Sequence, residues 1–233
     1  MQINIIDKCH PDTSTSSVLK TRLPAEALRE GWVSGSPHIF HNISGVHEFT
    51  ITGSTTIYIF LHTTQQTELT VITRCTEPGA HVDVRIIHLQ KSTEVLKLHT
   101  VQHHEKPHTT SIVTVKGVLY DQAQFTYQGK VYVGEQAEHT HAEQKSHTLL
   151  LSSTARAQAT PSLEVLTKKV QCKHGSAIAA CNAKQLEYLA SRGIALEDVH
   201  KILVESFFLA LLDDHDAQEY YRDYFLSRIV YPK

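Results

Sequence analysis

A thiol and an imidazole stand two positions apart in the stretch VQCKHGSAIAAC, at Cys172 and His174, and a second thiol follows at Cys181. Thiolate and imidazole are both good ligands for iron and other transition metals. Side chains at i and i+2 of a β-strand point to the same face, so a strand here would place Cys172 beside His174. Two ligands cannot hold a cluster alone. Cys172 and His174 are therefore candidate cluster or metal ligands whose remaining partners would come from another chain.

A catalytic Cys–His dyad fits this pair poorly. Residues i and i+2 of one strand are roughly 7 Å apart, too far for direct proton transfer. The Gly-x-Ser-x-Gly and Gly-x-x-x-x-Gly-Lys patterns of serine hydrolases and P-loop proteins are also absent from the sequence. The structural alternative makes Cys172 a small buried apolar side chain and lets Gly175 form a turn. Cys181 is expected to be structural.

The chain has 17 histidines, and histidine is the commonest metal ligand in proteins. The HTH of residues 139–141 would place two imidazoles on one face of a strand, and HHEKPH at 103–108 is expected to form a loop. A zinc site needs three or four ligands in a defined geometry, and these groups offer pairs. Histidines exposed to solvent are the competing interpretation.

Composition restricts the class of protein. The chain has 233 residues, of which 41% are hydrophobic and 20% charged, as in a globular protein with one large domain. A net charge of −2 gives no support for binding to nucleic acid. The N-terminus lacks a signal-peptide pattern, and no apolar run approaches the roughly 20 residues that span a bilayer. We therefore expect no membrane span, a cytoplasmic location and reduced cysteines.

From about residue 46 to 181 the sequence is typical of β-structure. Runs rich in Val, Ile, Thr and Tyr follow one another without a helical pattern, and several alternate, with Val82, Val84, Ile86 and His88 on one predicted face. A weak repeat of a polar-Ala-polar step, at Ala123, Ala137 and Ala157, suggests stacked coils. Residues 1–45 are expected to be irregular apart from a short helix at 24–32. A sandwich, a barrel and a β-helix all fit this pattern.

A helical domain is expected at residues 182–233. Asn182 with Gln185 would cap a first helix, and Gly193 would end it. The next helix carries an apolar stripe from Val199 to Leu211. A third is expected to begin with Asp216 and Glu219 as its capping pair. We interpret part of the stripe, around FFLALL, as a surface for a partner, with packing inside the domain as the alternative.

A series of short sequence motifs between residues 95 and 212 resembles, in the same order, the motifs of the SufB/SufD family of iron–sulfur cluster assembly scaffolds. The family pattern is F-x-G-x-I/V-x-V, then Q-x-x-x-x-LLLS, P-x-LEI, V-x-C-x-HG and YL-x-SRGI. The resemblance covers about half of the chain, and it is specific because the motifs are long and occur in the family's order. The matching residues are Phe125, Gly129, Val131, Val133, Gln144, 149–152, Pro161, 163–165, Val170, Cys172, His174, Gly175, Tyr188, Leu189 and 191–194.

This resemblance implies a mainly β fold, a right-handed parallel β-helix with a C-terminal helical subdomain. The Cys-x-His-Gly form is similar to the SufD branch, which implies a role for His174 in forming a transient cluster shared with a partner. It implies a scaffold and not an enzyme, paired through its β-helix with a SufB/SufD-like chain or with itself. It also implies docking of a SufC-type ABC ATPase on the C-terminal helices. The residues assigned to that docking are Arg192, Gly193, Val199, Ile202, Leu203, Phe207, Phe208 and Leu211.

The sequence departs from the family in being shorter and in having GSAIAACNAKQL before the YL-x-SRGI word. Two other hypotheses therefore stay open. One is a histidine-rich metalloenzyme with a cupin-like barrel, for which the HTH lacks the usual glycine context. The other is a purely structural β-helix homodimer. Replacement of His174 by alanine would separate a scaffold, which loses cluster delivery, from a structural protein, which is unaffected.

Overall fold

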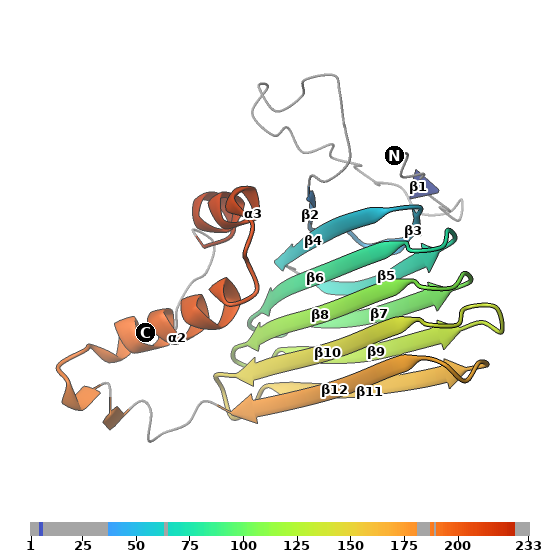
Figure 1. The fold of residues 1–233 in the computed structure, drawn as a ribbon. Helices are drawn as coiled ribbons and strands as arrows, with labels where there is room; N and C mark the ends of the chain where they lie inside the picture. The colour runs from blue at the N-terminus through green and yellow to red at the C-terminus, as the bar shows by residue number, and fades with distance from the viewer. Residues whose placement is uncertain (1–4, 7–36, 63–64, 181–186, 189, 227–233) are drawn as a thin grey trace, which may run out of the picture.

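Two six-stranded sheets, built mainly of parallel strands, face each other and form a β-helix (Figure 1). The computed structural model describes residues 5–6, 37–62, 65–180, 187–188 and 190–226. Consecutive strands alternate between the sheets, so the odd-numbered strands form one sheet and the even-numbered strands the other. The strands are β1 (Ile5–Ile6), β2 (His38–His41), β3 (Gly45–Ile51), β4 (Ser54–His62), β5 (Gln66–Cys75), β6 (His81–Gln90), β7 (Val95–His104), β8 (Thr110–Leu119), β9 (Gln124–Val133), β10 (His141–Leu150), β11 (Arg156–Val165) and β12 (Gln171–Ala180).

Each coil of the β-helix contributes one strand to each sheet. From β5 to β12, residues in register on neighbouring coils are 29 to 32 positions apart, as in His81 with Thr110 and Gln124 with Arg156. All of these strand pairs are parallel, and only the short β1 runs antiparallel to its neighbour β3. The predicted β-helix is thus confirmed. A cupin-like barrel is excluded because such jelly rolls are double-sheet antiparallel folds.

Alternating side chains build the core between the sheets. In β6 the side chains of Val82, Val84, Ile86 and His88 are all fully buried, which confirms the face predicted from the sequence. Branched side chains fit this pleated surface well, because successive residues point to opposite faces and one face is covered by the other sheet. The apolar core fills the β-helix from β3 to β9.

A recurring turn explains the weak alanine repeat. Ala80, Ala123, Ala137 and Ala155 are buried just before or close to the start of a strand, and the N–H of each donates to the carbonyl three residues earlier. The small side chain lets the turn fold against the core. The third member of the repeat is Ala155, whereas the predicted Ala157 lies inside β11 and pairs with Phe125.

Further along the strands the interior becomes polar. Thr100 and Gln102 of β7, with Gln144 and Ser146 of β10, are buried there. Gln102 Nε2 donates to Ser111 Oγ at 2.7 Å, and Ser111 Oγ also lies 2.7 Å from His104 Nε2. This network stabilises groups that would otherwise lose their bonds to water on burial.

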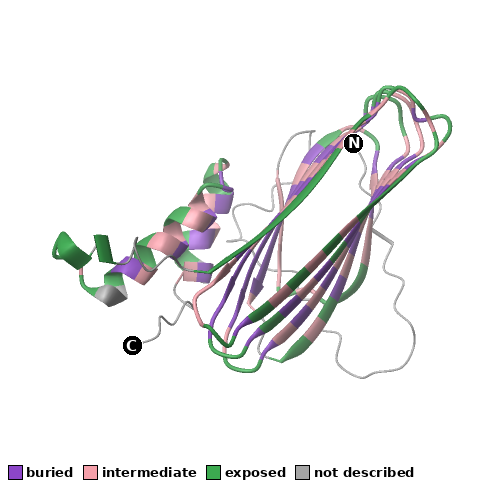
Figure 2. Ribbon diagram, turned by 90° about the horizontal axis from the view of Figure 1, so that it is seen from below, coloured by how far each residue is buried: buried purple, intermediate pink, exposed green. Residues whose placement is uncertain are grey.

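The helices pack on the outer face of the even-numbered sheet. They are α2 (Leu196–Leu209), α3 (His215–Tyr220) and the π-helical turn η1 (Tyr221–Phe225). Figure 2, seen from the β11–β12 end, shows them outside the two sheets. Phe208 and Leu212 are buried in one cluster with Tyr58, Phe60 and other outward side chains of β4, β6 and β8. The apolar stripe of α2 is therefore covered by the chain's own β-helix.

The helix ends differ partly from their predicted positions. The cap of α3 is Asp214, whose carboxylate accepts from Ala217 N at 3.1 Å, and not Asp216. Gly193 has a φ of +83°, as expected of a residue that ends a helix. The predicted capping pair Asn182 and Gln185 and the predicted helix at 24–32 lie outside the described residues. Strand β2 lies within the segment predicted to be irregular and pairs with β4.

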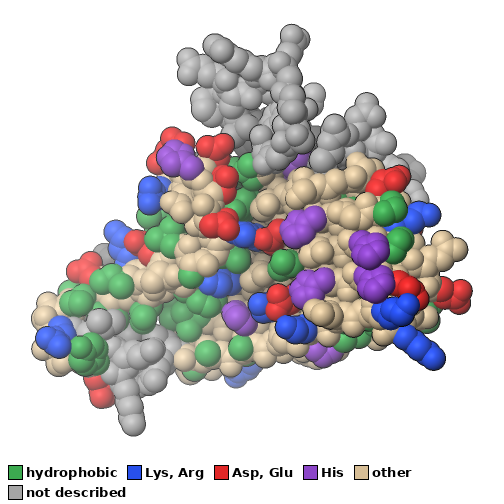
Figure 3. All heavy atoms as spheres, in the orientation of Figure 1, with side chains coloured by type: hydrophobic (Ala, Val, Ile, Leu, Met, Phe, Trp, Pro, Cys, Tyr) green, Lys and Arg blue, Asp and Glu red, His purple; other side chains and the backbone are tan. Residues whose placement is uncertain are grey.

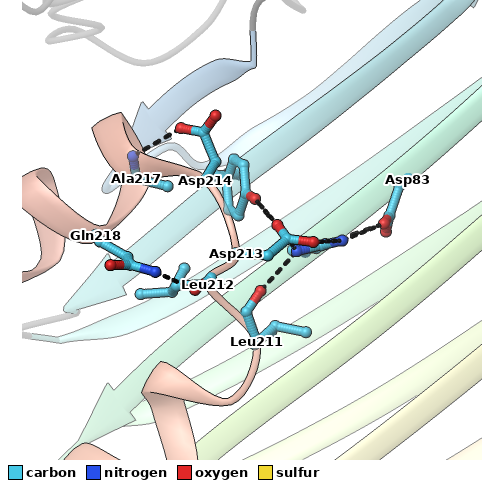
Figure 4. Close-up of polar contacts among 9 residues, drawn as sticks. Asp83, Leu211, Leu212, Asp213, Asp214, Ala217 and Gln218 are labelled. Atoms are coloured by element: carbon cyan, nitrogen blue, oxygen red, sulfur yellow. Dashed lines mark hydrogen bonds and ion pairs between the residues drawn. The ribbon is translucent and has the colours of Figure 1, made fainter.

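A polar clasp fastens the α2–α3 junction to the sheet (Figure 4). Arg85 of β6 forms ion pairs with Asp213 and Asp83 and donates to the carbonyl of Leu211 at 2.8 Å. Tyr58 of β4 donates to Asp213 Oδ1 at 2.8 Å. Desolvation opposes the charged form of Arg85, but its hydrogen bonds to the carboxylates of Asp83 and Asp213 outweigh it and raise the pKa of the guanidinium. The hydrogen bonds that Asp213 accepts from Arg85 and Tyr58 lower the pKa of its carboxyl group.

Candidate functional site

The β-helix ends in an unpaired coil. Strand β11 pairs only with β9, and β12 only with β10, so both strands are edges among the residues that the structure describes. Their residues are mostly exposed, as the end view of Figure 2 shows. Leu163, Val165 and Ile178 are large hydrophobic side chains that remain 38–44% exposed. Edge strands of this kind can pair with another chain.

Cys172 and His174 share the interior face of β12. In register they pair with Ala142 and Gln144, whose side chains are buried in the interior of the preceding coil. The same-face geometry inferred for these two residues therefore holds. Cys172 is half-buried against the apolar cluster of Val131 and Ala142, whereas His174 is exposed at the open end. Burial raises the pKa of the Cys172 thiol, so at neutral pH it would have to lose a proton to bind a metal.

Gly129 and Gln144 both belong to the family motifs, and they lie close together inside the β-helix. A Cβ atom on Gly129 would lie 2.4 Å from the side-chain amide of Gln144. The missing side chain of Gly129 therefore makes room for Gln144, which crosses from β10 toward the opposite sheet. Spacing in the sequence gave no sign of this contact because the two residues lie on strands of different sheets.

Replacement of Gly129 by alanine is expected to lower the free energy of unfolding by about 1–3 kcal/mol, because the new methyl group displaces a buried amide. The double variant Gly129→Ala with Gln144→Ala should be less destabilised than the sum of the two single changes. Urea unfolding of all four proteins measures this coupling. Additive effects would show that the two side chains do not compete for the same space.

Each of the two histidine groups is divided between a strand and a turn. His139 lies in a turn with φ of +59° and stacks on His108, with ring centroids 4.8 Å apart, while His141 begins β10. The prediction that the HTH lies on one strand face is therefore wrong. His103 and His104 belong to β7 and not to a loop. The face seen in Figure 3 shows histidines scattered among charged side chains.

Within the described ranges, one group of three side chains could hold a metal ion: His215, Asp216 and Glu219, all exposed on α3. No group of three includes Cys172 or His174, so within the described part of this single chain they remain a pair. Cys75, the other free cysteine among the residues that the structure describes, is buried, and desolvation raises the pKa of its thiol to about 12.

The residues assigned to ATPase docking fall into two groups. Val199, Phe208 and Leu211 are buried inside the chain. Leu203 and Phe207 are half-buried, and Ile202 is 45% exposed. Arg192 is exposed next to Gly193 and lies over the ring of Tyr188, with its guanidinium carbon 5.4 Å from the ring centroid. The members of the assigned set that are exposed or half-buried are thus Arg192, Gly193, Ile202, Leu203 and Phe207.

The comparisons with known proteins agree with this architecture. Residues 52–207 match the family model described as SUF system FeS cluster assembly, SufBD core domain. The chain is 35% identical over 107 residues to an iron–sulfur cluster assembly SufBD family protein of Synechocystis, covering 46% of this chain and 24% of that protein. It is 30% identical over 143 residues to the chloroplastic protein ABCI7 of Arabidopsis thaliana, covering 61% and 30%. It is 27% identical over 120 residues to SufD of Escherichia coli, covering 52% and 28%.

The chain thus spans about a quarter to a third of the length of these relatives. No helix in the described part of the chain is both long and apolar enough to cross a bilayer. The parallel β-helix, the helices on its outer face and a family match over two thirds of the sequence lead to one assignment. The chain belongs to the SufBD core-domain family of the SUF iron–sulfur cluster assembly system.

Proposed function

We propose that this protein is a SufD-like scaffold subunit that helps to build iron–sulfur clusters and performs no catalysis of its own. The observation that carries the proposal is the open coil, where Cys172 and His174 face the interior between two unpaired strand edges. A thiol and an imidazole can both bind iron. The cluster is cargo, held transiently and shared with a second chain that supplies the other ligands. The Cys-x-His-Gly stretch and the similarity to SufD support the SufD-like assignment.

The second chain pairs at the open end. The edges of β11 and β12 offer unpaired backbone groups, and Leu163, Val165 and Ile178 offer apolar surface beside them. Strand addition at these edges would extend both sheets into the partner. The partner is a SufB/SufD-like chain or a second copy of this protein. Either would place its own ligands next to His174.

The helical tail docks a SufC-type ABC ATPase. Exposed Arg192 and Ile202, with half-buried Leu203 and Phe207, supply the contact surface. Val199, Phe208 and Leu211 act indirectly, by holding α2 on the β-helix. A contiguous apolar patch that stays exposed on a packed helix is typical of an interaction surface, whereas the buried part of the stripe is typical of a core.

Replacement of Ile202 by aspartate is expected to weaken co-purification with a SufC-type ATPase from the same source at least tenfold, because it places a charge in the apolar contact. Val46, which is 46% exposed on β3, supplies the matched control Val46→Asp. A pull-down with the ATPase rate recorded measures both. Absence of binding by the unmodified chain at micromolar concentration would contradict ATPase docking.

The cluster role has a separate test. His174→Ala should keep the fold, because the side chain is exposed, and lose cluster delivery to an acceptor protein. Far-ultraviolet circular dichroism checks the fold, and the appearance of acceptor activity follows delivery. Unchanged delivery would favour a purely structural β-helix.

A further inference from the structure

Two buried polar atoms of β10 lack hydrogen-bond partners. Gln144 and Ser146 are each 1% exposed, and neither Gln144 Oε1 nor Ser146 Oγ is bonded to any group in the described part of the chain. Buried polar groups are nearly always paired, because an unpaired group has given up its hydrogen bonds to water without replacing them, and this costs free energy. Both residues lie on the interior face of the strand next to the open coil.

The neighbouring strand has a polar side chain opposite each of them. Gln144 is in register with His174, and Ser146 with Ser176. Parallel neighbours lie about 4.8 Å apart, and residues in register point to the same face. An imidazole N–H can therefore reach the amide oxygen by rotation of the His174 side chain. Cys172 is in register with Ala142, which has no acceptor on its side chain.

The orientation of the Gln144 amide is set from its other side. Gln102 Nε2 donates to the carbonyls of Ser111 and Glu143, so its oxygen is left to face Gln144. Gln144 must present its NH₂ to that oxygen, and Nε2 lies 3.4 Å from both Gln102 Oε1 and Thr100 Oγ1. The oxygen of Gln144 thus remains as a fixed acceptor. It is the last member of a chain of hydrogen bonds that begins at His104.

We propose that Gln144 is a positioning residue for His174: its side-chain oxygen accepts the N–H of one ring nitrogen and so fixes the tautomer that leaves the other nitrogen free to bind iron. Histidines that bind metals commonly donate their second ring N–H to such an acceptor, which sets ring orientation and tautomer. This inference rests on the proposed role of His174 as a cluster ligand. The bond to Gln144 itself needs no metal.

Nitrogen-15 NMR of the full chain, without metal, tests the bond, with the His174 signals assigned from the His174→Ala variant. We expect one dominant tautomer of His174 in the unmodified protein and a mixture in Gln144→Met, which keeps the length of the side chain and removes the acceptor. Ser146→Ala is the matched control, because Ser146 is equally buried but faces Ser176; it should leave the tautomer unchanged. The same tautomer population in Gln144→Met as in the unmodified chain would overturn the inference.

Titration with cobalt(II), which reports on its ligands through its absorption, tests the consequence. Gln144→Met should bind cobalt(II) at least tenfold more weakly than the unmodified chain, and Gln144→Glu, which restores an acceptor, should recover most of the affinity. A mixed tautomer in Gln144→Met, with no cobalt(II) binding by any variant, would support the bond to Gln144 and contradict metal binding by His174 in the single chain. Cobalt(II) binding at His174 with an unchanged tautomer in Gln144→Met would support the ligand role and contradict the positioning role.

Discussion

Replacement of Phe208 by alanine is expected to lower the free energy of unfolding by about 3–5 kcal/mol and to loosen the helical tail from the β-helix. The side chain is fully buried between the outer face of β4, β6 and β8 and the aromatic residues of α3 and η1. Its ring packs edge-on against Tyr221 and Phe225, with centroids 6.2 and 6.0 Å away. Alanine removes these contacts and leaves a cavity that rigid strands cannot fill.

Urea unfolding measures the loss of stability, and limited proteolysis shows whether the tail is released first. Ile202→Ala on the same helix is the control, because its side chain is 45% exposed and the change should cost no more than about 0.5 kcal/mol. Equal effects of the two substitutions would contradict the packing of α2 on the sheet. A loss of stability without faster cleavage between α2 and the β-helix would show that the tail stays anchored by the Arg85 clasp.

Acid is expected to destabilise the fold between about pH 6.5 and pH 4. Burial lowers the pKa of both His88 and His104 to about 4, whereas in the unfolded chain each would titrate near 6.5. Over that window the unfolded chain binds more protons, so the free energy of unfolding falls as the pH falls. At about 1.4 kcal/mol per pKa unit the loss is on the order of 3 kcal/mol per histidine once the pH reaches 4.

The free energy of unfolding should therefore be compared at pH 7.5, 6, 5 and 4.5. In His104→Gln, which keeps a donor and an acceptor for Thr109 and Ser111, the decline should be shallower. His99 lies on the same strand and points to the outer face, so His99→Gln should leave the decline unchanged. A pH profile that His104→Gln does not alter would mean that His104 takes up its proton without opening the core.

Much of the β-helix could be predicted because its early coils have ordinary β sequences. Branched apolar side chains alternate with polar ones along much of β6 and β8, and this pattern indicates which face of each strand is buried. The last coils were harder. Strand β12 contains Gly175 and three alanines, and β11 contains Pro161, so neither has a high β propensity. These strands form because the preceding coil supplies a template of backbone partners.

The site was predictable only in part. The strand geometry of Cys172 and His174 follows from period-2 alternation, and the structure agrees. The contact of Gly129 with Gln144 depends on how the two sheets stack, which no local pattern encodes. The stripe of α2 posed a similar problem, because an apolar face looks the same whether it covers a partner or the chain's own sheet. Phe208 and Leu212 belong to the second case.

The clasp of Arg85 also fixes a distance. It fastens the tail to β6, whereas His174 lies on β12, three strands further along the same sheet. Each strand adds about 4.8 Å, so the tail is anchored roughly 14 Å from the end coil. The number of coils between the clasp and the end coil therefore sets the distance between the helical tail and His174. A chain with one extra coil of about 30 residues between β6 and β12 would keep the clasp and the end coil intact and would increase the distance between them by about 4.8 Å.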